Sequence, residues 1–150
     1  MKNLIILFAA AFLVILTGCK DDDPVEYPIV GVWQPTQMVK NTVANNDTST
    51  TTETFIYSQC EMDGRWIFNE DMTGSVLLKE MFGGTTCVQT KNATFKYTYD
   101  KLSGKLIIDY INLSEQGAIT DVTESTMNLK IEEFNASGYV SKTYSLVKIQ

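Results

Sequence analysis

The sequence predicts an all-β fold, an antiparallel up-and-down β-barrel of about eight strands. Three observations predict it: apolar and polar residues alternate with a period of two, turn residues separate the segments, and no helical periodicity follows Cys19. A row of hairpins with one apolar face can bury that face by closing into a barrel, which also removes exposed edges. A β-sandwich is the alternative arrangement.

The clearest alternation is TFKYTYD at residues 94–100, where the aromatic residues share one face. A turn at 101–104 leads into 105–110, in which Leu106, Ile108 and Tyr110 share a face. The other strands are expected near 30–40, 54–59, 65–68, 75–79, 86–91, 117–123, 127–132 and 139–149. The polar stretch NTVANNDTSTTT, residues 41–52, is expected to be a long mobile loop because strand-like sequence lies on both sides.

Composition excludes several classes of function. The net charge of −6 argues against a nucleic-acid partner, which would reward clustered basic residues. The absence of histidine excludes Ser–His–Asp and Cys–His nucleophile systems and histidine-ligated zinc. Carboxylates gather at Glu61, Asp63, Glu70 and Asp71, but Glu70 and Asp71 fall in an expected turn, where solvated acids are ordinary. We therefore predict no enzyme activity, no metal and no cofactor.

The N-terminus predicts export. Lys2 precedes an apolar run of 13 residues, 4–16, whereas a membrane-spanning helix needs roughly 20, so a secretory signal fits better. The run ends in Leu-Thr-Gly-Cys, which resembles the lipobox of bacterial lipoproteins. That resemblance implies cleavage after Gly18, lipid on Cys19, a signal peptide at 1–18 and an acidic tether at 19–28. The alternative is an ordinary signal peptide with a chance cysteine.

The tether also bears on location. Lys20 followed by three aspartates resembles the export signal of surface-exposed lipoproteins in some Gram-negative lineages. We expect the protein at the bacterial outer membrane, anchored by lipid on Cys19 and exposed at the cell surface, with the periplasmic face as the alternative.

Two cysteines remain once Cys19 is set aside. Cys60 and Cys87 form an even pair in an exported protein, and such pairs are normally disulfides in an oxidising compartment. A disulfide that closes a loop of about 28 residues would stabilise the folded state by roughly 3–4 kcal/mol, according to the chain-entropy relation. The spacing does not suit a redox pair, which would favour Cys-x-x-Cys.

Residues 29–150 resemble the small lipocalin-like domains of bacterial lipoproteins. The matching stretches are Gly31-Val32-Trp33, Cys60, the turn at 68–74, Cys87 and the closing strand at 144–148. The resemblance implies a barrel in which Trp33 packs across the closed end and Gly31 permits a close approach. The late arginine that stacks on the signature Trp in lipocalins is missing, because Arg65 is the only arginine; Lys142 or Lys148 could substitute.

Five aromatic residues are the candidate lining of a ligand pocket: Trp66, Phe68, Phe95, Tyr97 and Tyr99. The alternative is that they fill the core, because about eight strands leave room for one small ligand at most. The leading hypothesis is a monomeric binding module for a small apolar or amphipathic molecule. The competing hypothesis is a solid-core structural or interaction domain that docks another envelope protein or a glycan.

Overall fold

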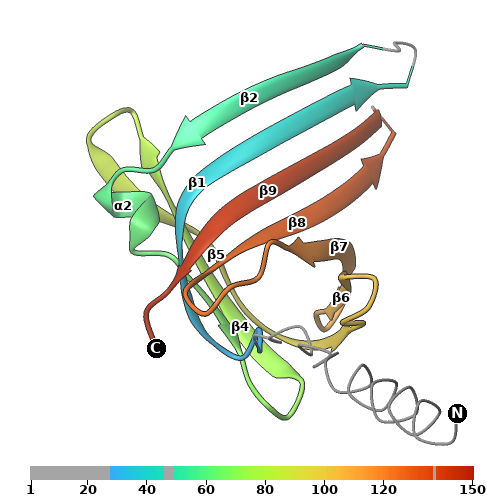
Figure 1. The fold of residues 1–150 in the computed structure, drawn as a ribbon. Coiled ribbons are helices and arrows are strands. Elements are labelled where there is room, and N and C mark those ends of the chain that lie inside the picture. The colour runs from blue at the N-terminus through green and yellow to red at the C-terminus, as the bar shows by residue number, and fades with distance from the viewer. Residues whose placement is uncertain (1–27, 46–48, 137) are drawn as a thin grey trace, which may run out of the picture.

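The structure is a computed structural model, which describes residues 28–45, 49–136 and 138–150. The predicted signal peptide, Cys19 and the tether up to residue 27 lie outside the described residues. No helix in the described part is long and apolar enough to cross a membrane. The described elements, drawn in Figure 1, are β1 (Gly31–Ala44), β2 (Thr50–Ile56), α2 (Gln59–Met62), β3 (Arg65–Phe68), β4 (Thr73–Phe82), β5 (Thr86–Tyr99), β6 (Lys105–Asp109), β7 (Ser114–Thr120), β8 (Thr126–Asn135) and β9 (Gly138–Lys148).

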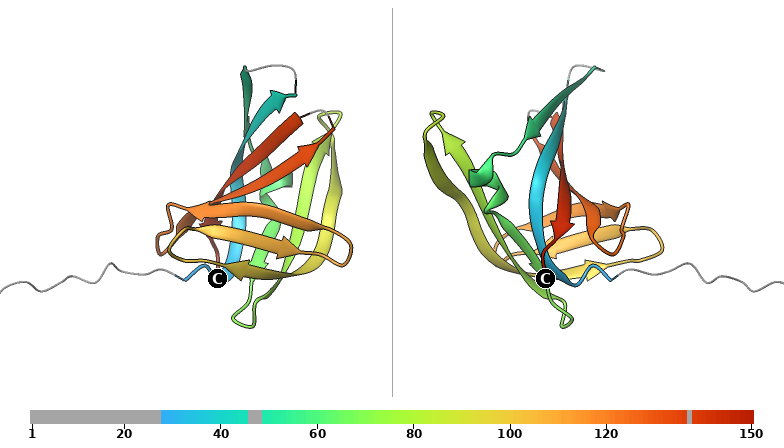
Figure 2. Two further views of the ribbon diagram at one scale, coloured as in Figure 1. Left: turned by 90° about the vertical axis from the view of Figure 1, so that its right-hand side faces the viewer. Right: turned by 60° about the vertical axis from the view of Figure 1, so that its left-hand side comes forward.

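The strands form one antiparallel sheet that closes on itself. Strands β3 to β9 pair in chain order, and β1 pairs with both β3 and β9, which closes a barrel of eight strands (Figure 2). The β1–β9 ladder runs from Trp33 opposite Lys148 to Ala44 opposite Gly138. The predicted up-and-down barrel is confirmed, and a sandwich of two separate sheets is excluded. Strand β2 is an additional strand outside the eight.

Strand β2 corrects the loop expected at 41–52. Strand β1 pairs with β3 only at residues 31–33, and further along the same edge it pairs with β2, where Asn41 lies opposite Thr52. The Thr52 hydroxyl donates a hydrogen bond of 2.7 Å to Asn41 Oδ1. Threonine suits a pleated strand, and polar side chains are tolerated because every residue of β2 is exposed. The polar residues at 41–52 therefore belong to solvent-exposed strands, β2 and the end of β1, which extend past the barrel.

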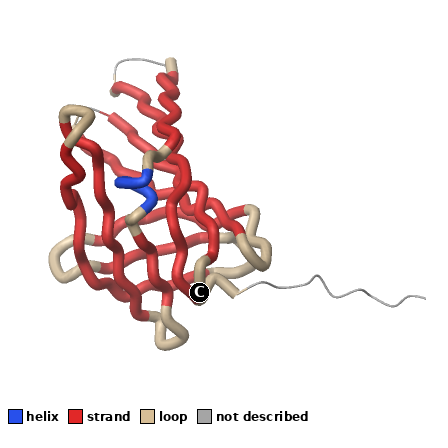
Figure 3. The backbone as a smooth tube through the Cα atoms, turned by 90° about the vertical axis from the view of Figure 1, so that its left-hand side faces the viewer, coloured by secondary structure: helices blue, strands red, loops and turns tan. Residues whose placement is uncertain are grey.

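A short helix corrects the expectation of none after Cys19. In α2, Ser58 and Glu61 form a capping box, with the Ser58 N–H donating to Glu61 Oε2 at 2.9 Å. Glu61 Oε1 also accepts from the Met81 N–H at 2.9 Å, just past the residues at which β3 pairs with β4. The helix, blue in Figure 3, thus caps a stretch of the β4 edge that β3 leaves uncovered. Four residues are too few to show a helical period.

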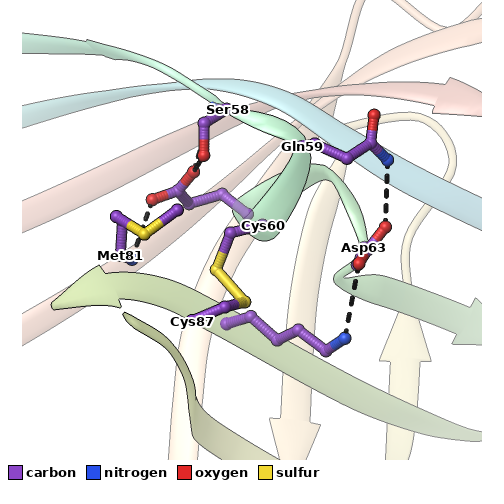
Figure 4. Close-up of a disulfide and its surroundings, with 8 residues drawn as sticks. Ser58, Gln59, Cys60, Asp63, Met81 and Cys87 are labelled. Atoms are coloured by element: carbon purple, nitrogen blue, oxygen red, sulfur yellow. Dashed lines mark hydrogen bonds and ion pairs between the residues drawn. A yellow bond between two sulfur atoms is a disulfide. The ribbon is translucent and has the colours of Figure 1, made fainter. Parts of the chain in front are cut away.

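The predicted disulfide is present and joins this helix to the sheet. Cys60 and Cys87 are bonded, with their Cα atoms 5.6 Å apart (Figure 4). Beside the bond, Gln59 Nε2 donates to Asp63 Oδ1 at 3.0 Å, and Lys79 Nζ lies 3.5 Å from Asp63 Oδ2. These contacts connect the segment between β2 and β3 with the β4–β5 hairpin. In the described part of the chain, β2 and β4 are not paired with each other, so the disulfide and its neighbours join the two sides.

The core fills one end of the barrel. Its buried residues come from the parts of the strands nearest Trp33, whereas the far halves of β1, β4, β5 and β8 are half-buried or exposed. In the far half of β9, Gly138 and Ser141 are still buried. Aromatic rings pack at its centre, with the Phe68 and Tyr97 centroids 5.1 Å apart in an edge-to-face arrangement. The buried hydrophobic residues of this cluster are Ile29, Trp33, Trp66, Phe68, Val76, Phe95, Tyr97, Leu106, Ile108, Ile119, Met127, Leu129, Tyr144 and Leu146. The whole cluster lies within residues 29–150.

Candidate ligand-binding site

Trp33 closes one end of the barrel. Its side chain is fully buried, and its indole N–H donates to the Ile29 carbonyl at 2.7 Å. Lys148 Nζ lies 5.4 Å from the centroid of the Trp33 ring. Of the two lysines that the sequence offered in place of the missing arginine, Lys148 is therefore the one that contacts Trp33. Gly31 has φ +143°, and a Cβ there would lie 2.5 Å from Lys148 Cε. Gly31 is therefore what lets Lys148 reach the Trp33 ring.

The opposite end of the barrel is hollow. A cavity of about 450 Å³ lies there, and we call it the open-end cavity. Trp66 and Tyr144 belong to the buried core and also line this cavity, with ring centroids 5.9 Å apart, so they form its floor. The remaining lining residues are Leu78, Lys91, Leu113, Ser114, Glu115, Gln116, Ile131, Glu132, Glu133, Phe134, Val140 and Lys142. Its lining combines an aromatic floor, aliphatic walls and charged groups.

An ion pair lies in the wall of the open-end cavity. Lys91 Nζ is 2.8 Å from Glu115 Oε1, and the side chains are only 29% and 18% exposed. The Tyr110 hydroxyl donates to Glu115 Oε2 at 3.0 Å, and Lys91 Nζ lies 4.2 Å from the Tyr110 ring centroid. Burial and the neighbouring Glu115 raise the pKa of Tyr110 above its usual range. At neutral pH this tyrosine is therefore a neutral donor that holds Glu115 in place.

The phenols of Tyr144 and Tyr57 are also neutral at neutral pH. Burial raises the pKa of Tyr144, and Tyr57, Glu115 and Glu80 act in the same direction. Burial, with help from Glu80 and Glu61, raises the pKa of Tyr57 to about 12. The buried indole N–H of Trp66 has no hydrogen-bond acceptor within the described part of the chain. The floor thus combines aromatic surface with donor groups.

A comparison of the sequence with protein-family models matches residues 29–129 to the lipocalin-like domain, which is more than half of the chain. The chain belongs to this family. Among solved structures, it is similar to a deswapped triple mutant of bovine odorant-binding protein, with 14% identity over 79% of this chain and 72% of that one and a TM-score of 0.44. It is also similar to bovine odorant-binding protein in complex with undecanal, with 13% identity over 86% of this chain and 78% of that one and a TM-score of 0.47. The comparison with curated proteins finds no similar sequence.

The lipocalin-like barrel distributes the five predicted pocket residues over three places. Trp66 is in the floor of the open-end cavity, and Phe68 and Phe95 pack beneath it with centroids 6.4 and 6.1 Å from its ring. Tyr97 and Tyr99 line a separate groove of about 810 Å³ at the Trp33 end, where residues 28–30 also lie. The Tyr97 hydroxyl is engaged there, donating to the Asn69 carbonyl at 2.7 Å.

Sequence reasoning missed most of the lipocalin-like domain's cavity wall, including Lys91, Glu115, Lys142 and Tyr144. The period-two pattern was available for Tyr144, which shares a face with the buried Leu146. Lys91 follows the same alternation, because it shares a face with Phe95 and Tyr97 and the β4–β5 register shift falls beyond it. The division of this segment into two expected strands, 86–91 and 94–100, hid that relation.

The candidate acidic residues are divided between two places in this domain. Glu61 and Asp63 lie at α2, whereas Asp71 lies in the β3–β4 turn, where its carboxylate accepts from the Thr73 N–H and hydroxyl. Burial opposes ionisation of Glu61, but hydrogen bonds from Ser58 and the Met81 N–H lower its pKa; hydrogen bonds likewise lower the pKa of Asp63 and Asp71. A general acid needs a raised pKa, which these three lack. Within the described residues, no group of three or more His, Cys, Asp or Glu could hold a metal.

Proposed function

We propose that this lipocalin-like domain binds one small apolar or amphipathic molecule in the open-end cavity. The observation that carries the proposal is the cavity itself, about 450 Å³ inside a barrel whose opposite end is closed by Trp33. Pockets for small molecules usually measure about 300–1,000 Å³ and combine apolar walls with a few polar groups. The aromatic floor and the Lys91–Glu115 pair match that description.

The polar groups favour an amphipathic ligand over a pure hydrocarbon. A hydrocarbon that filled the cavity would remove water from the half-buried Lys91–Glu115 pair without replacing its hydrogen bonds, and this desolvation costs free energy. A ligand with a polar end can keep that end near the charged groups and place its apolar part against Trp66 and Tyr144. The cavity can thus contact both the apolar tail and the polar head of an amphipathic ligand.

Tryptophan fluorescence tests the proposal because the two tryptophans lie at opposite ends of the barrel. Two variants of the domain, residues 24–150, are titrated with 1-decanol. Trp33→Phe leaves Trp66 as the fluorescent reporter, and Trp66→Phe leaves Trp33. We expect the fluorescence of Trp66 to change saturably with 1-decanol and the fluorescence of Trp33 to stay constant. Circular dichroism checks that both variants are folded. A flat response from Trp66, or equal responses from both reporters, would contradict binding in the open-end cavity.

We also propose that lipid on Cys19 anchors the domain to the bacterial outer membrane at the cell surface. The sequence pattern around Cys19 supports this, and the position of residue 28 is compatible with it. Pro28 lies at the Trp33 end, so the tether that leads to Cys19 joins the domain at the end opposite the open-end cavity. Cys19→Ala should release the protein from the membrane fraction; unchanged fractionation would refute the anchor. Protease digestion of intact cells distinguishes the cell surface from the periplasmic face.

A second candidate function is docking of an envelope protein or a glycan. The supporting observation is the outer edge of β2, which pairs with no strand in the described part of the chain, next to the exposed side chains of Phe55 and Ile56. Native mass spectrometry of protein purified from cells separates the two functions. A retained small molecule supports binding in the cavity, whereas an empty domain with a co-purifying partner supports docking.

A further inference from the structure

Two lysines face each other on the inner wall of the barrel. Lys142 on β9 lines the open-end cavity, as does Tyr144, two residues further along the same face. In the β1–β9 ladder, Lys142 lies directly opposite Lys40, just as Tyr144 lies opposite Met38. Residues directly opposite on antiparallel strands have neighbouring side chains, and like charges in such a pair are destabilising. The wall therefore holds an unfavourable pair of positive charges.

Ion pairs reach Lys40 and Lys91 but not Lys142. Lys40 Nζ lies 3.3 Å from Glu53 Oε2 on β2, and Lys91 on the far wall is paired with Glu115. Lys142 makes no ion pair with any residue in 28–45, 49–136 or 138–150. Among the other acids of the lining, Glu132 is paired with Lys130, and Glu133 is exposed towards the end of β8. Within the described residues, Lys142 is thus the lysine of the lining without an ion pair, and Glu133, at the exposed rim, is the acid without one.

We propose that the ligand of the open-end cavity is an amphiphile with an anionic head group, such as a carboxylate, and that Lys142 binds this head. This inference rests on the proposed function and adds the ligand's charge to it. An anion beside Lys142 would offset the repulsion from Lys40 and the partial desolvation of the ammonium group. The apolar tail would then lie against Trp66, Tyr144 and the aliphatic walls.

The test compares two ligands that share one chain length, decanoate and 1-decanol, on three forms of the domain. The forms are the wild type, Lys142→Gln, and Lys96→Gln as a matched control, because Lys96 is an exposed lysine on β5 outside the cavity. We expect the wild type and the Lys96→Gln control to prefer decanoate by about fivefold, as a partly exposed charge pair supports. Lys142→Gln should bring the ratio of the two affinities close to one without weakening the binding of 1-decanol. Raising the ionic strength should shrink the wild-type preference.

The outcomes separate this inference from the proposed function. If 1-decanol binds but decanoate is not preferred, or if Lys142→Gln keeps the preference, the anionic head is refuted and the cavity remains a binding site. If neither ligand binds, the proposed function fails and this inference fails with it. A second measurement needs no ligand: Lys142→Gln removes the like-charge pair, so the melting temperature of the free domain should rise by about 1–4 °C. A fall in melting temperature relative to Lys96→Gln would overturn the premise.

Discussion

Removing the Cys60–Cys87 disulfide tests whether the contact between α2 and the β4–β5 hairpin stabilises the barrel. The cysteines are 27 positions apart, and the chain-entropy relation for a loop of this size gives about 3.6 kcal/mol at 25 °C. Cys60 is buried and Cys87 is exposed, so the double variant Cys60→Ala, Cys87→Ser avoids burying a hydroxyl. We expect the free energy of unfolding to fall by about 3–4 kcal/mol and the melting temperature by about 10–15 °C.

Urea denaturation followed by circular dichroism measures this loss. Wild-type protein unfolded in the presence of a dithiol reductant is the control, because it should lose about the same free energy without a change of sequence. A loss below about 1 kcal/mol would refute the chain-entropy reasoning. It would mean that residual structure in the unfolded chain already holds residues 60 and 87 near each other, so that the disulfide removes little further entropy.

Three further perturbations test particular contacts. Gly31→Ala should cost about 2–4 kcal/mol by urea denaturation, because a side chain is strained at its φ of +143° and the new Cβ would lie 2.7 Å from the Gln150 backbone oxygen. Gly83→Ala, with φ +60° and open space around it, should cost about 1 kcal/mol, and equal losses would contradict the close packing at Gly31. Glu115→Gln should cost about 1–2 kcal/mol, less than a fully buried pair because Lys91 keeps 29% exposure, and no loss would mean that the pair is fully screened. The raised pKa of Tyr57 implies stability that is complete below pH 10 and is lost as the pH rises towards about 12. Because the chain has seven tyrosines, the measurement is the difference in tyrosinate absorbance between the wild type and Tyr57→Phe; a difference that appears at the ordinary pKa would contradict this.

Local alternation was enough to predict the barrel strands and their inward faces. Phe95 and Tyr97 of β5, and Leu106 and Ile108 of β6, are buried as the period-two pattern requires. The disulfide was predictable because the cysteine count and the expected oxidising compartment leave one pairing. These features depend on residues close in sequence or on simple counting.

The position of the cavity was not predictable in the same way. It depends on how far each strand extends past the core, and therefore on pairings between distant segments such as β1 with β9. The sequence also divided β5 into two strands, 86–91 and 94–100, whereas the chain continues as one strand past a register shift that still leaves Lys91 facing the cavity. Polar residues at 41–52 indicated a loop because sequence alone does not show that β1 continues beyond the barrel with β2 beside it.

The most direct test of binding in the open-end cavity is a two-dimensional ¹H–¹⁵N spectrum recorded while an amphiphile is added. The chain has two tryptophans, so it gives two indole N–H signals, one from the cavity floor and one from the opposite end. With decanoate, we expect the Trp66 signal to shift saturably while the Trp33 signal stays in place. A saturable shift at Trp33 with Trp66 unmoved would put the ligand at the wrong end of the barrel and contradict the assignment.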